Sequence, residues 1–304
     1  MKLNQLRDMV AIVERGSLRA AARHLELAQP ALTRSIRTLE HELGTTLFER
    51  EAKGMVLTPM GRLFYLRASS VVNELRRARE ELEQTSGDMQ GTVVAGLSIM
   101  PHVGMLPSAL PAFRKKFPKV KLKIIEGLYP AIEVGLRDGS IDFYLGASPH
   151  TSPAPGLVAE VLFENTRTIV GRKNHPLSGA KSIKELGQAE WATTSVNYNA
   201  AEDLDELFAK YKMPAPKVML QAHSAMSVMV ALAYSDLLAI LPVQWNEFPL
   251  TRGALQMINI RERLPAPSIV CIRRPDLPLT PAAEYFCDLL RRYSASEAVA
   301  HSTK

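Results

Sequence analysis

The segment GSLRAAARHLELAQPALTRSIRTLE (Gly16–Glu40) has the pattern of two short amphipathic helices at a fixed separation. Ser17 can cap the first helix, whose leucines and alanines form an apolar face that a second helix can cross closely. Glu26 and Leu27 make the turn, and Pro30 suits the first turn of the next helix because its missing N–H costs nothing there. The spacing therefore predicts a helix-turn-helix.

The second of these helices has one apolar and one polar side. The positions expected to point inward are Ala31, Leu32, Ile36 and Leu39. The outward positions carry residue types that reach phosphates and base edges in the major groove, namely Gln29, Pro30, Thr33, Arg34 and Arg37. We expect Gln29 and Arg34 to read bases, and Thr33 and Arg37 to hold phosphates. The plainer alternative is a solvated polar face on an ordinary helical hairpin.

A short hairpin is predicted after the second helix, in the segment LGTTLFEREAKGMVLTPMG (Leu43–Gly61). Gly44 stops the helix, and Gly54 can turn the hairpin. Arg50 and Lys53 would then lie on a wing beside the second helix. Because both are cationic and close to the proposed groove-reading surface, we expect them to add phosphate contacts.

The first ninety residues resemble the DNA-binding end of a LysR-type transcriptional regulator, and the order of elements over the remainder also fits that family. The matching positions are Gly16-Ser17-Leu18, Ala20-Ala21, Gln29-Pro30-Ala31-Leu32, Leu39-Glu40, Leu43-Gly44, Leu47-Phe48, Arg50 and Leu57-Thr58. One departure is Ala28, which stands where the family commonly has a capping Ser or Thr. The resemblance implies a winged helix-turn-helix, a long linker helix and an α/β effector domain of two Rossmann-like lobes, similar to periplasmic binding proteins.

The distribution of charge agrees with a nucleic-acid partner. The chain has 304 residues and a formal net charge of +6. Residues 1–67 hold 11 Lys or Arg against 7 Asp or Glu, whereas residues 68–304 hold 26 against 24. Positive charge is therefore denser at the N-terminal end, as an electrostatic footprint on phosphate requires, although ordinary solubility charge can reach this size.

Other compositional signals argue against export, membrane insertion and metal binding. Residues 1–8 are already amphipathic and charged rather than an apolar leader, so we expect a cytoplasmic protein. The apolar stretch 225–243 is broken by two serines, an aspartate and a proline, which favours a core helix and a strand over a membrane span. Cys271 and Cys287 lack Cys or His partners at metal-ligand spacing, so we expect inert thiols, with a redox switch as the alternative. No cofactor is expected beyond a small-molecule co-inducer.

A long helix is predicted from Thr58, a good N-cap, to about Ser86. Its apolar residues recur in alternating steps of four and three, the spacing of a coiled-coil seam. They are Phe64, Ala68, Val71, Leu75, Ala78 and Leu82. In the resembled family this helix pairs with its twin, which implies a homo-oligomer, either dimer or tetramer, on a pseudo-palindromic site. The alternative is a helix packed on its own domain.

Beyond Gly91 the sequence alternates short β-branched runs with helical patterns, which predicts α/β units with parallel strands. The first unit has strands at 93–97, 120–125 and 141–145 and helices at 105–117 and 131–137. The second has strands at 168–170, 191–194, 218–220 and 237–240 and helices at 200–211 and 225–234. Strand 269–272 returns to the first unit before a last helix at 281–293.

These elements divide the chain into three expected parts. The DNA-binding domain takes residues 1–58, and the linker helix with its hinge takes residues 59–90. The effector domain takes residues 91–304, with lobe I at 91–163 and 268–296 and lobe II at 164–267. Two lobes joined by two crossings suit a ligand cleft at their interface.

Strand 93–97 leads through Ser98 into a helix, whose first N–H groups, near Met100 and Pro101, would favour an anion. The resemblance implies further cleft walls by position. The expected effector contacts are Ser98, Met100, Pro101, Tyr129, Ser195, Tyr198 and His223. The alternatives are a capping role for Ser98, a structural role for His223 and a core role for both tyrosines. We expect a small anionic effector, with an aromatic ring as an open option.

Two C-terminal segments resemble a subgroup of the family that includes a regulator of toluenesulfonate degradation. They are Tyr234-Ser235-Asp236-Leu237-Leu238 with Leu241-Pro242, and Arg274-Pro275-Asp276-Leu277-Pro278. Most family members place glycines where Ser235-Asp236 stand. The resemblance points toward aromatic acids as effectors.

An enzyme is the main rival class. The run Gly96-Leu97-Ser98-Ile99-Met100 looks like a nucleophile elbow, but Met100 stands where the tight turn needs a second glycine. The sequence also lacks a phosphate loop and a dinucleotide glycine fingerprint. We therefore predict a regulator rather than an enzyme, whose DNA geometry or RNA polymerase contacts change when a small molecule binds. An architectural DNA binder without an effector is the alternative, and activation and repression stay equally open.

Overall fold

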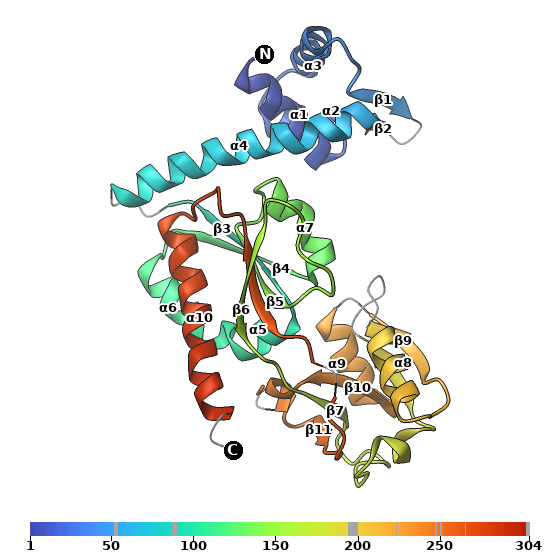
Figure 1. The fold of residues 1–304 in the computed structure, drawn as a ribbon. Helices are drawn as coiled ribbons and strands as arrows, with labels where there is room; N and C mark the ends of the chain where they lie inside the picture. The colour runs from blue at the N-terminus through green and yellow to red at the C-terminus, as the bar shows by residue number, and fades with distance from the viewer. Residues whose placement is uncertain are drawn as a thin grey trace.

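The chain folds into a helical head with a small wing, one long helix and two α/β lobes (Figure 1). This arrangement is a computed structural model. It describes residues 1–51, 54–86, 90–193, 200–222, 224–246, 248–249, 251–264 and 266–301. Within the described residues, no helix is both long enough and apolar enough to cross a membrane.

The head packs three helices and a two-stranded hairpin around one apolar core. Its elements are α1 (Leu3–Arg15), α2 (Leu18–His24), α3 (Gln29–Leu43), β1 (Phe48–Glu51) and β2 (Gly54–Leu57). The Ala20 N–H donates to the Ser17 hydroxyl at 3.2 Å, so Ser17 caps α2 as expected. Leu32 and Leu39 of α3 are fully buried in the core. The predicted winged helix-turn-helix is confirmed.

One inward position was predicted wrongly. Ala31 is exposed, whereas Leu32, Ile36 and Leu39 are buried. The buried stripe of α3 therefore begins at Leu32, and Ala31 lies about 100° from it around the helix axis. A single methyl group at the solvent-facing first turn keeps the backbone of this end of α3 accessible.

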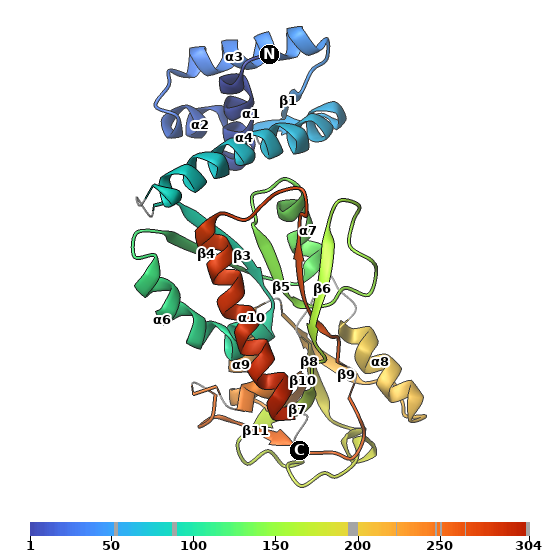
Figure 2. The same ribbon diagram turned by 60° about the vertical axis from the view of Figure 1, so that its left-hand side comes forward.

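Helix α4 (Pro59–Thr85) confirms the predicted long helix of 27 residues. The Thr58 hydroxyl caps it, accepting from the Gly61 N–H at 2.9 Å, and donates to the Thr46 carbonyl at 2.8 Å. A Cβ at Gly61 would lie 2.0 Å from the Leu47 carbonyl oxygen, so only glycine allows this close approach. Helix α4 is thereby fixed to the wing, and it runs between the head and the upper lobe (Figures 1 and 2).

Lobe I is built on a five-stranded sheet of order β4-β3-β5-β12-β6. Strands β3, β4 and β5 are parallel, and β12 is antiparallel to both β5 and β6. The strands are β3 (Thr92–Leu97), β4 (Lys121–Glu126), β5 (Phe143–Ala147), β6 (Val158–Phe163) and β12 (Ile269–Arg273). The helices are α5 (Ile99–Gly104), α6 (Leu106–Lys116), α7 (Tyr129–Arg137) and α10 (Pro281–His301). One face of the sheet packs on α6 and α10, and the other packs on α7.

Lobe II has a second five-stranded sheet, of order β11-β7-β10-β8-β9. Its strands are β7 (Arg167–Arg172), β8 (Glu190–Thr193), β9 (Lys217–Gln221), β10 (Leu237–Pro242) and β11 (Leu255–Ile258). Its helices are α8 (Ala200–Lys210) and α9 (Ala225–Tyr234), with short 3-10 turns η1 (Ile183–Leu186) and η2 (Val243–Asn246). Helices α8 and α9 cover opposite faces of the sheet. The return of β12 to the first sheet matches the sequence prediction, whereas β6 and β11 were not predicted.

Candidate functional site

Helix α3 presents the polar side that the sequence predicts. The side chains of Gln29, Pro30, Arg34 and Arg37 are exposed, and Thr33 is half-buried. The Thr33 hydroxyl donates to the Gln29 carbonyl at 3.0 Å, within the helix. Figures 1 and 2 show α3 along the outer edge of the head, on the side away from both lobes. The helix is thus free to approach a groove of DNA without obstruction by the rest of the chain.

Two carboxylates fix the direction of α3. The Ser35 hydroxyl donates to the buried carboxylate of Asp8 on α1. The carboxylate of Glu40 accepts from the Leu47 and Phe48 N–H groups, at 2.8 and 3.1 Å, where the wing begins. These contacts join α3 to α1 at its middle and to the wing near its C-terminal end, so its outward face is held in one orientation.

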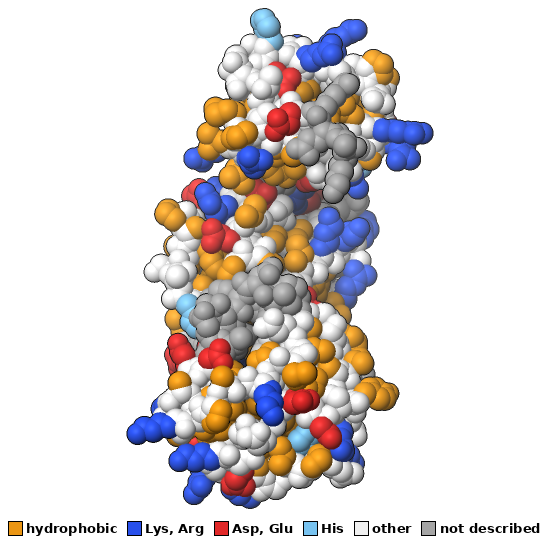
Figure 3. Space-filling view, turned by 90° about the vertical axis from the view of Figure 1, so that its right-hand side faces the viewer, with side chains coloured by type: hydrophobic (Ala, Val, Ile, Leu, Met, Phe, Trp, Pro, Cys, Tyr) orange, Lys and Arg blue, Asp and Glu red, His pale blue; other side chains and the backbone are white. Residues whose placement is uncertain are grey.

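The first turn of α3 and the wing are the remaining parts of this surface. Ala28 precedes the helix and, as the sequence indicates, provides no side-chain cap. The N–H groups of that turn can therefore receive an external acceptor such as a phosphate oxygen. Lys53 and the side chain of Arg50 lie outside the described residues. Figure 3 shows Lys and Arg side chains around the head, at the top of the molecule.

The predicted seam of α4 is largely uncovered along its second half. Val71, Leu75 and Leu82 are large apolar side chains that face solvent in the single chain, whereas Ala68 is buried against the head. Arg76 and Arg79 flank a shallow groove that Val72 and Leu75 help to line beside α1. An apolar stripe of this length is the kind of surface that a second helix covers.

A pocket opens at the junction of the two lobes. Its empty space is about 460 Å³ counted with its open mouth, but the interior that a water-sized sphere can enter is only about 40 Å³, so the pocket is narrow in this structure. From lobe I it is lined by the first residues of α7 and the end of β5, and from lobe II by the first residue of β7 and by α8. The lining residues are Leu128, Tyr129, Pro130, Ala147, Ser148, Pro149, His150, Arg167, Asp203 and Pro267.

The charged groups of this pocket are concentrated at one point. The Arg167 guanidinium donates to the Asp203 carboxylate at 3.0 Å, and the His150 ring lies 3.9 Å from the same carboxylate. A smaller hollow on the other side of this pair is lined by Trp191 and Thr193. Among the described residues, the Trp191 indole N–H and the Thr193 hydroxyl find no hydrogen-bond partner, although both are buried. The site therefore holds unsatisfied polar groups beside an arginine.

The expected effector contacts fall into three groups. Tyr129 lines the pocket, and its hydroxyl accepts from the Ala154 N–H at 3.0 Å. Ser98, Met100 and Pro101 are buried and do not line the pocket, although the Ser98 hydroxyl accepts from the N–H of the lining residue Ala147 at 3.2 Å. Ser98 precedes α5 without a side-chain cap bond. The third group, Ser195, Tyr198 and His223, lies outside the described residues.

Sequence reasoning missed the ionisable residues of the pocket, namely His150, Arg167 and Asp203, as well as Ser148. His150 lies in a loop that carries no helix or strand pattern. Arg167 stands directly before the predicted strand 168–170, and a charged residue next to a buried run at a lobe crossing is a signal that could have found it. Asp203 is one of several acids in a helical segment, so the sequence gives no reason to separate it from the others.

Comparison with known proteins assigns the family. Residues 3–62 match the family described as "Bacterial regulatory helix-turn-helix protein, lysR family", and residues 86–295 match the "LysR substrate binding domain". The chain belongs to the LysR family of transcriptional regulators. It is thus a DNA-binding regulator with an effector-binding domain, and not an enzyme.

Individual LysR regulators resemble the chain over nearly its whole length. The HTH-type transcriptional regulator GalR of Pseudomonas putida is 27% identical over 97% of this chain and 74% of its own. The "SDS degradation transcriptional activation protein" of a Pseudomonas species is 27% identical over 93% of each chain. The structure of full-length CbnR with its target DNA superposes with a TM-score of 0.68 at 21% identity, covering 96% of this chain and all of that one. At this level of identity, the similarity to CbnR shows a shared fold.

Proposed function

We propose that this LysR regulator binds pseudo-palindromic promoter DNA as a homo-oligomer and responds to a small anion held between its lobes. The observation that carries the DNA-binding part is the exposed polar face of α3, which is fixed at its middle and near its C-terminal end and is unobstructed. Gln29 and Arg34 project from its first turns, where such helices reach base edges. We assign base reading to these two, and phosphate contacts to Thr33, Arg37, Arg50 and Lys53.

Substitution of a base-reading residue and of a phosphate-holding residue should change DNA affinity in different ways. Binding sites would first be selected from random duplexes with the full-length protein, because this needs no known promoter. Gln29→Ala should then cost about 1–3 kcal/mol on the selected site and flatten its preference over random DNA. Lys53→Ala should weaken all DNA alike and reduce the salt slope by about one. Equal losses on selected and random DNA for Gln29→Ala would remove the base-reading assignment.

The exposed seam of α4 supports the homo-oligomer. Its spacing is that of a two-helix interface, and the large apolar side chains of its second half, Val71, Leu75 and Leu82, are exposed in the single chain. Pairing of two heads raises the effective concentration of each on a two-half-site operator, which explains why a regulator would keep this surface. A protein that acts on promoter DNA in this way belongs in the cytoplasm, and RNA polymerase is a candidate partner of the bound complex.

The pocket chemistry supports an anionic effector. Arg167 faces a carboxylate, Asp203, that an incoming anion can replace, and the Trp191 N–H next to it is a free donor among the described residues. Helix α7 begins at the pocket wall without a side-chain cap, so the positive end of its dipole lies at the same space. Tyr129 offers a ring for an aromatic ligand. The relative named for SDS degradation and the resemblance to the toluenesulfonate subgroup both agree with a sulfonate or sulfate anion.

Thermal unfolding across a ligand panel tests the effector class. We would use benzoate, 4-toluenesulfonate, dodecyl sulfate below its denaturing concentration, and neutral and cationic analogues, because a ligand that binds only the folded state raises the melting temperature. An anion-specific rise that Arg167→Met abolishes supports the proposal, with Arg172→Met, which lies outside the pocket, as the matched control. A rise with cations alone, or one that Arg167→Met leaves intact, would contradict it. No shift with any ligand of a broad metabolite panel would favour an architectural DNA binder.

A further inference from the structure

The side of α4 opposite its seam is polar, yet it is the buried side. Its residues recur in steps of four and three, offset by about half a helical turn from the apolar positions. They are Ser69, Asn73, Arg77, Glu80 and Gln84, and all contact lobe I or the segment leading into it. Burial of charged side chains costs free energy unless they are paired and hydrogen-bonded, so the stability of this side depends on the partners of these residues.

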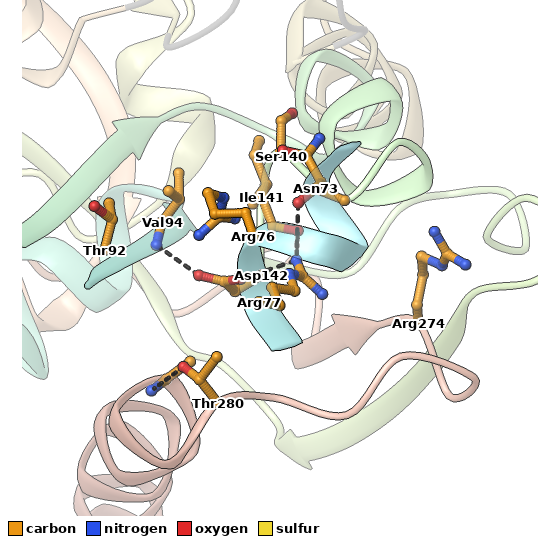
Figure 4. Close-up of polar contacts among 12 residues, drawn as sticks. Asn73, Arg76, Arg77, Thr92, Val94, Ser140, Ile141, Asp142, Arg274 and Thr280 are labelled. Carbon is orange, nitrogen blue, oxygen red and sulfur yellow. Dashed lines mark hydrogen bonds and ion pairs between the residues drawn. The ribbon is translucent and has the colours of Figure 1, made fainter. Parts of the chain in front are cut away.

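Arg77 is the centre of this contact and is only 4% exposed. Its guanidinium forms an ion pair with Asp142 at 2.8 Å and donates to the Gly139 and Ile141 carbonyls at 2.9 and 3.3 Å. The other Asp142 oxygen accepts from the Val94 N–H of β3 at 2.7 Å. Figure 4 shows Arg77 reaching from α4 toward Asp142 and Ile141, with Val94 on the far side of the carboxylate. We call Arg77 and these acceptors the Arg77 anchor.

Contacts on either side extend the anchor along the helix. The Asn73 amide donates to the Asp138 carbonyl at 2.9 Å, and the Ser69 hydroxyl donates to the Asp138 carboxylate at 3.4 Å. Toward the end of α4, the Glu80 carboxylate accepts from the Thr92 N–H at 3.2 Å, and Gln84 accepts from the Ala282 N–H at 3.0 Å. The helix is therefore attached chiefly to the turn 138–142 and to the start of β3.

The anchor defines a geometry more than it adds stability. Burial lowers the pKa of Arg77 and raises the pKa of Asp142, in both cases against the attraction between the two charges. The desolvation of both groups thus offsets much of their Coulomb energy. The pairing is also incomplete, because the buried Arg77 Nε–H has no hydrogen-bond partner among the described residues, while one terminal nitrogen of the guanidinium serves Asp142, Gly139 and Ile141.

The turn 138–142 is directly connected to the effector pocket by two rigid elements. Residues 128–130 line the pocket at the start of α7, and α7 ends at Arg137, immediately before the turn. Strand β5 begins at Phe143, immediately after the turn, and ends at Ala147 in the pocket wall. The segment 128–148 therefore leaves the pocket, contacts α4 at the Arg77 anchor and returns to the pocket.

We propose that segment 128–148 is a relay that couples occupancy of the pocket to the placement of the linker helix, with Arg77 as the positioning residue that receives the displacement. The inference rests on the proposed effector function of the pocket. Displacement of α7 or β5 by a ligand moves the turn 138–142 relative to α4. Because α4 carries the DNA-binding head at its other end, a change at the anchor alters the spacing of the two heads on DNA.

Hydrogen exchange of the full-length protein, followed by mass spectrometry, tests the coupling without any ligand. Ser148→Trp fills the pocket end, and Arg77→Met disables the anchor end. We expect Ser148→Trp to raise exchange at least fivefold in the peptides covering 92–97 and 138–142, which include the Val94, Ser140 and Asp142 amides. Arg77→Met should reciprocally raise exchange at Ala147 and Ala154, because coupling between two sites acts in both directions.

Matched control variants distinguish coupling between the pocket and the Arg77 anchor from a general loss of stability. Ser178→Trp changes an exposed serine of lobe II, and Arg79→Met changes an exposed arginine of α4, so neither should alter exchange at the far end. If Ser148→Trp does not fold, Tyr129→Phe perturbs the same pocket wall by removing one hydroxyl contact. Exchange unchanged at the far end in both directions overturns the relay and leaves the effector proposal standing. Coupled exchange together with a failed anion panel removes the proposed effector class and leaves the relay intact.

Discussion

The two sides of α4 differ from those of an ordinary surface helix. On the apolar side, Leu82 is 72% exposed and Val71 is 49% exposed, whereas on the polar side Glu80 is 8% exposed. A surface helix normally buries its apolar stripe and solvates its charges. The inversion teaches that the two sides have different uses: the polar side sets the position of the helix on its own lobe, and the apolar side is available to a second chain.

The largest expected effect is on the polar side. Asp142→Ala leaves the Arg77 guanidinium buried without its counter-charge, which should cost about 3–5 kcal/mol of unfolding free energy. Urea denaturation at a fixed protein concentration measures it. The double variant Arg77→Met/Asp142→Asn, which removes both charges and keeps an acceptor for the Val94 N–H, should be less damaging than Asp142→Ala alone. A double variant as unstable as the sum of its single changes would show that the two residues do not act as a pair.

The apolar side should show its effect in association rather than in folding. Val71→Asp with Leu75→Asp places charges in the expected helix interface and should weaken self-association at least a hundredfold, about 2.7 kcal/mol. Sedimentation velocity over a dilution series measures this. Glu74→Gln with Glu81→Gln changes the net charge by the same amount in the opposite direction, on the exposed flank, and should leave association unchanged. A double aspartate variant that still associates normally would mean that the apolar stripe is not the contact between chains.

A smaller effect is expected from a single neutral hydrogen bond of the polar side. Asn73→Ala removes the amide that donates to the Asp138 carbonyl and should cost about 1 kcal/mol of unfolding free energy. Glu74→Ala, one residue further along and exposed, should cost much less. An equal loss of unfolding free energy in the two variants would mean that the hydrogen bond from Asn73 does not stabilise the docked side of the helix.

The smallest effect is a pH dependence. Burial raises the pKa of Glu80 above its ordinary value of 4.5, against the opposing effect of Arg76. The folded chain then binds this proton more tightly than the unfolded chain, so stability falls as pH rises from 4.5 through the raised pKa. Denaturation at several pH values should show a shallower fall for Glu80→Gln, and an unchanged one for the exposed Glu81→Gln. A fall of the same depth in Glu80→Gln would assign the pH dependence to other groups.

The regular elements could be predicted from sequence because their apolar spacing is unambiguous. The steps at Leu32, Ile36 and Leu39 and along the seam of α4 gave both helices, and the β-branched runs gave most strands of both lobes. The parallel direction was wrong for β7 and β12, which are antiparallel to their neighbours. Strand β6 was missed because Val158 and Val161 are exposed at the edge of its sheet, so no buried pattern marks it.

The polar docking side of α4 could not be predicted for a different reason. Charged residues at helical spacing normally indicate a solvated face, and nothing local to Arg77 distinguishes it from the exposed Arg79. Its counter-charge is 65 positions away, directly before a strand, where an aspartate is also a common turn residue. The pocket residues Arg167 and Asp203 are also far apart in the sequence, by 36 positions, so neither pairing could be predicted from local sequence.

Cryo-electron microscopy of the full-length chain on its selected DNA tests the division of α4 into two sides most directly. We predict a dimer in which the seam containing Val71 and Leu75 lies between two linker helices, while Arg77 meets Asp142 of its own chain. A map in which the seam faces solvent and the Ser69–Gln84 side forms the contact between chains would contradict this account.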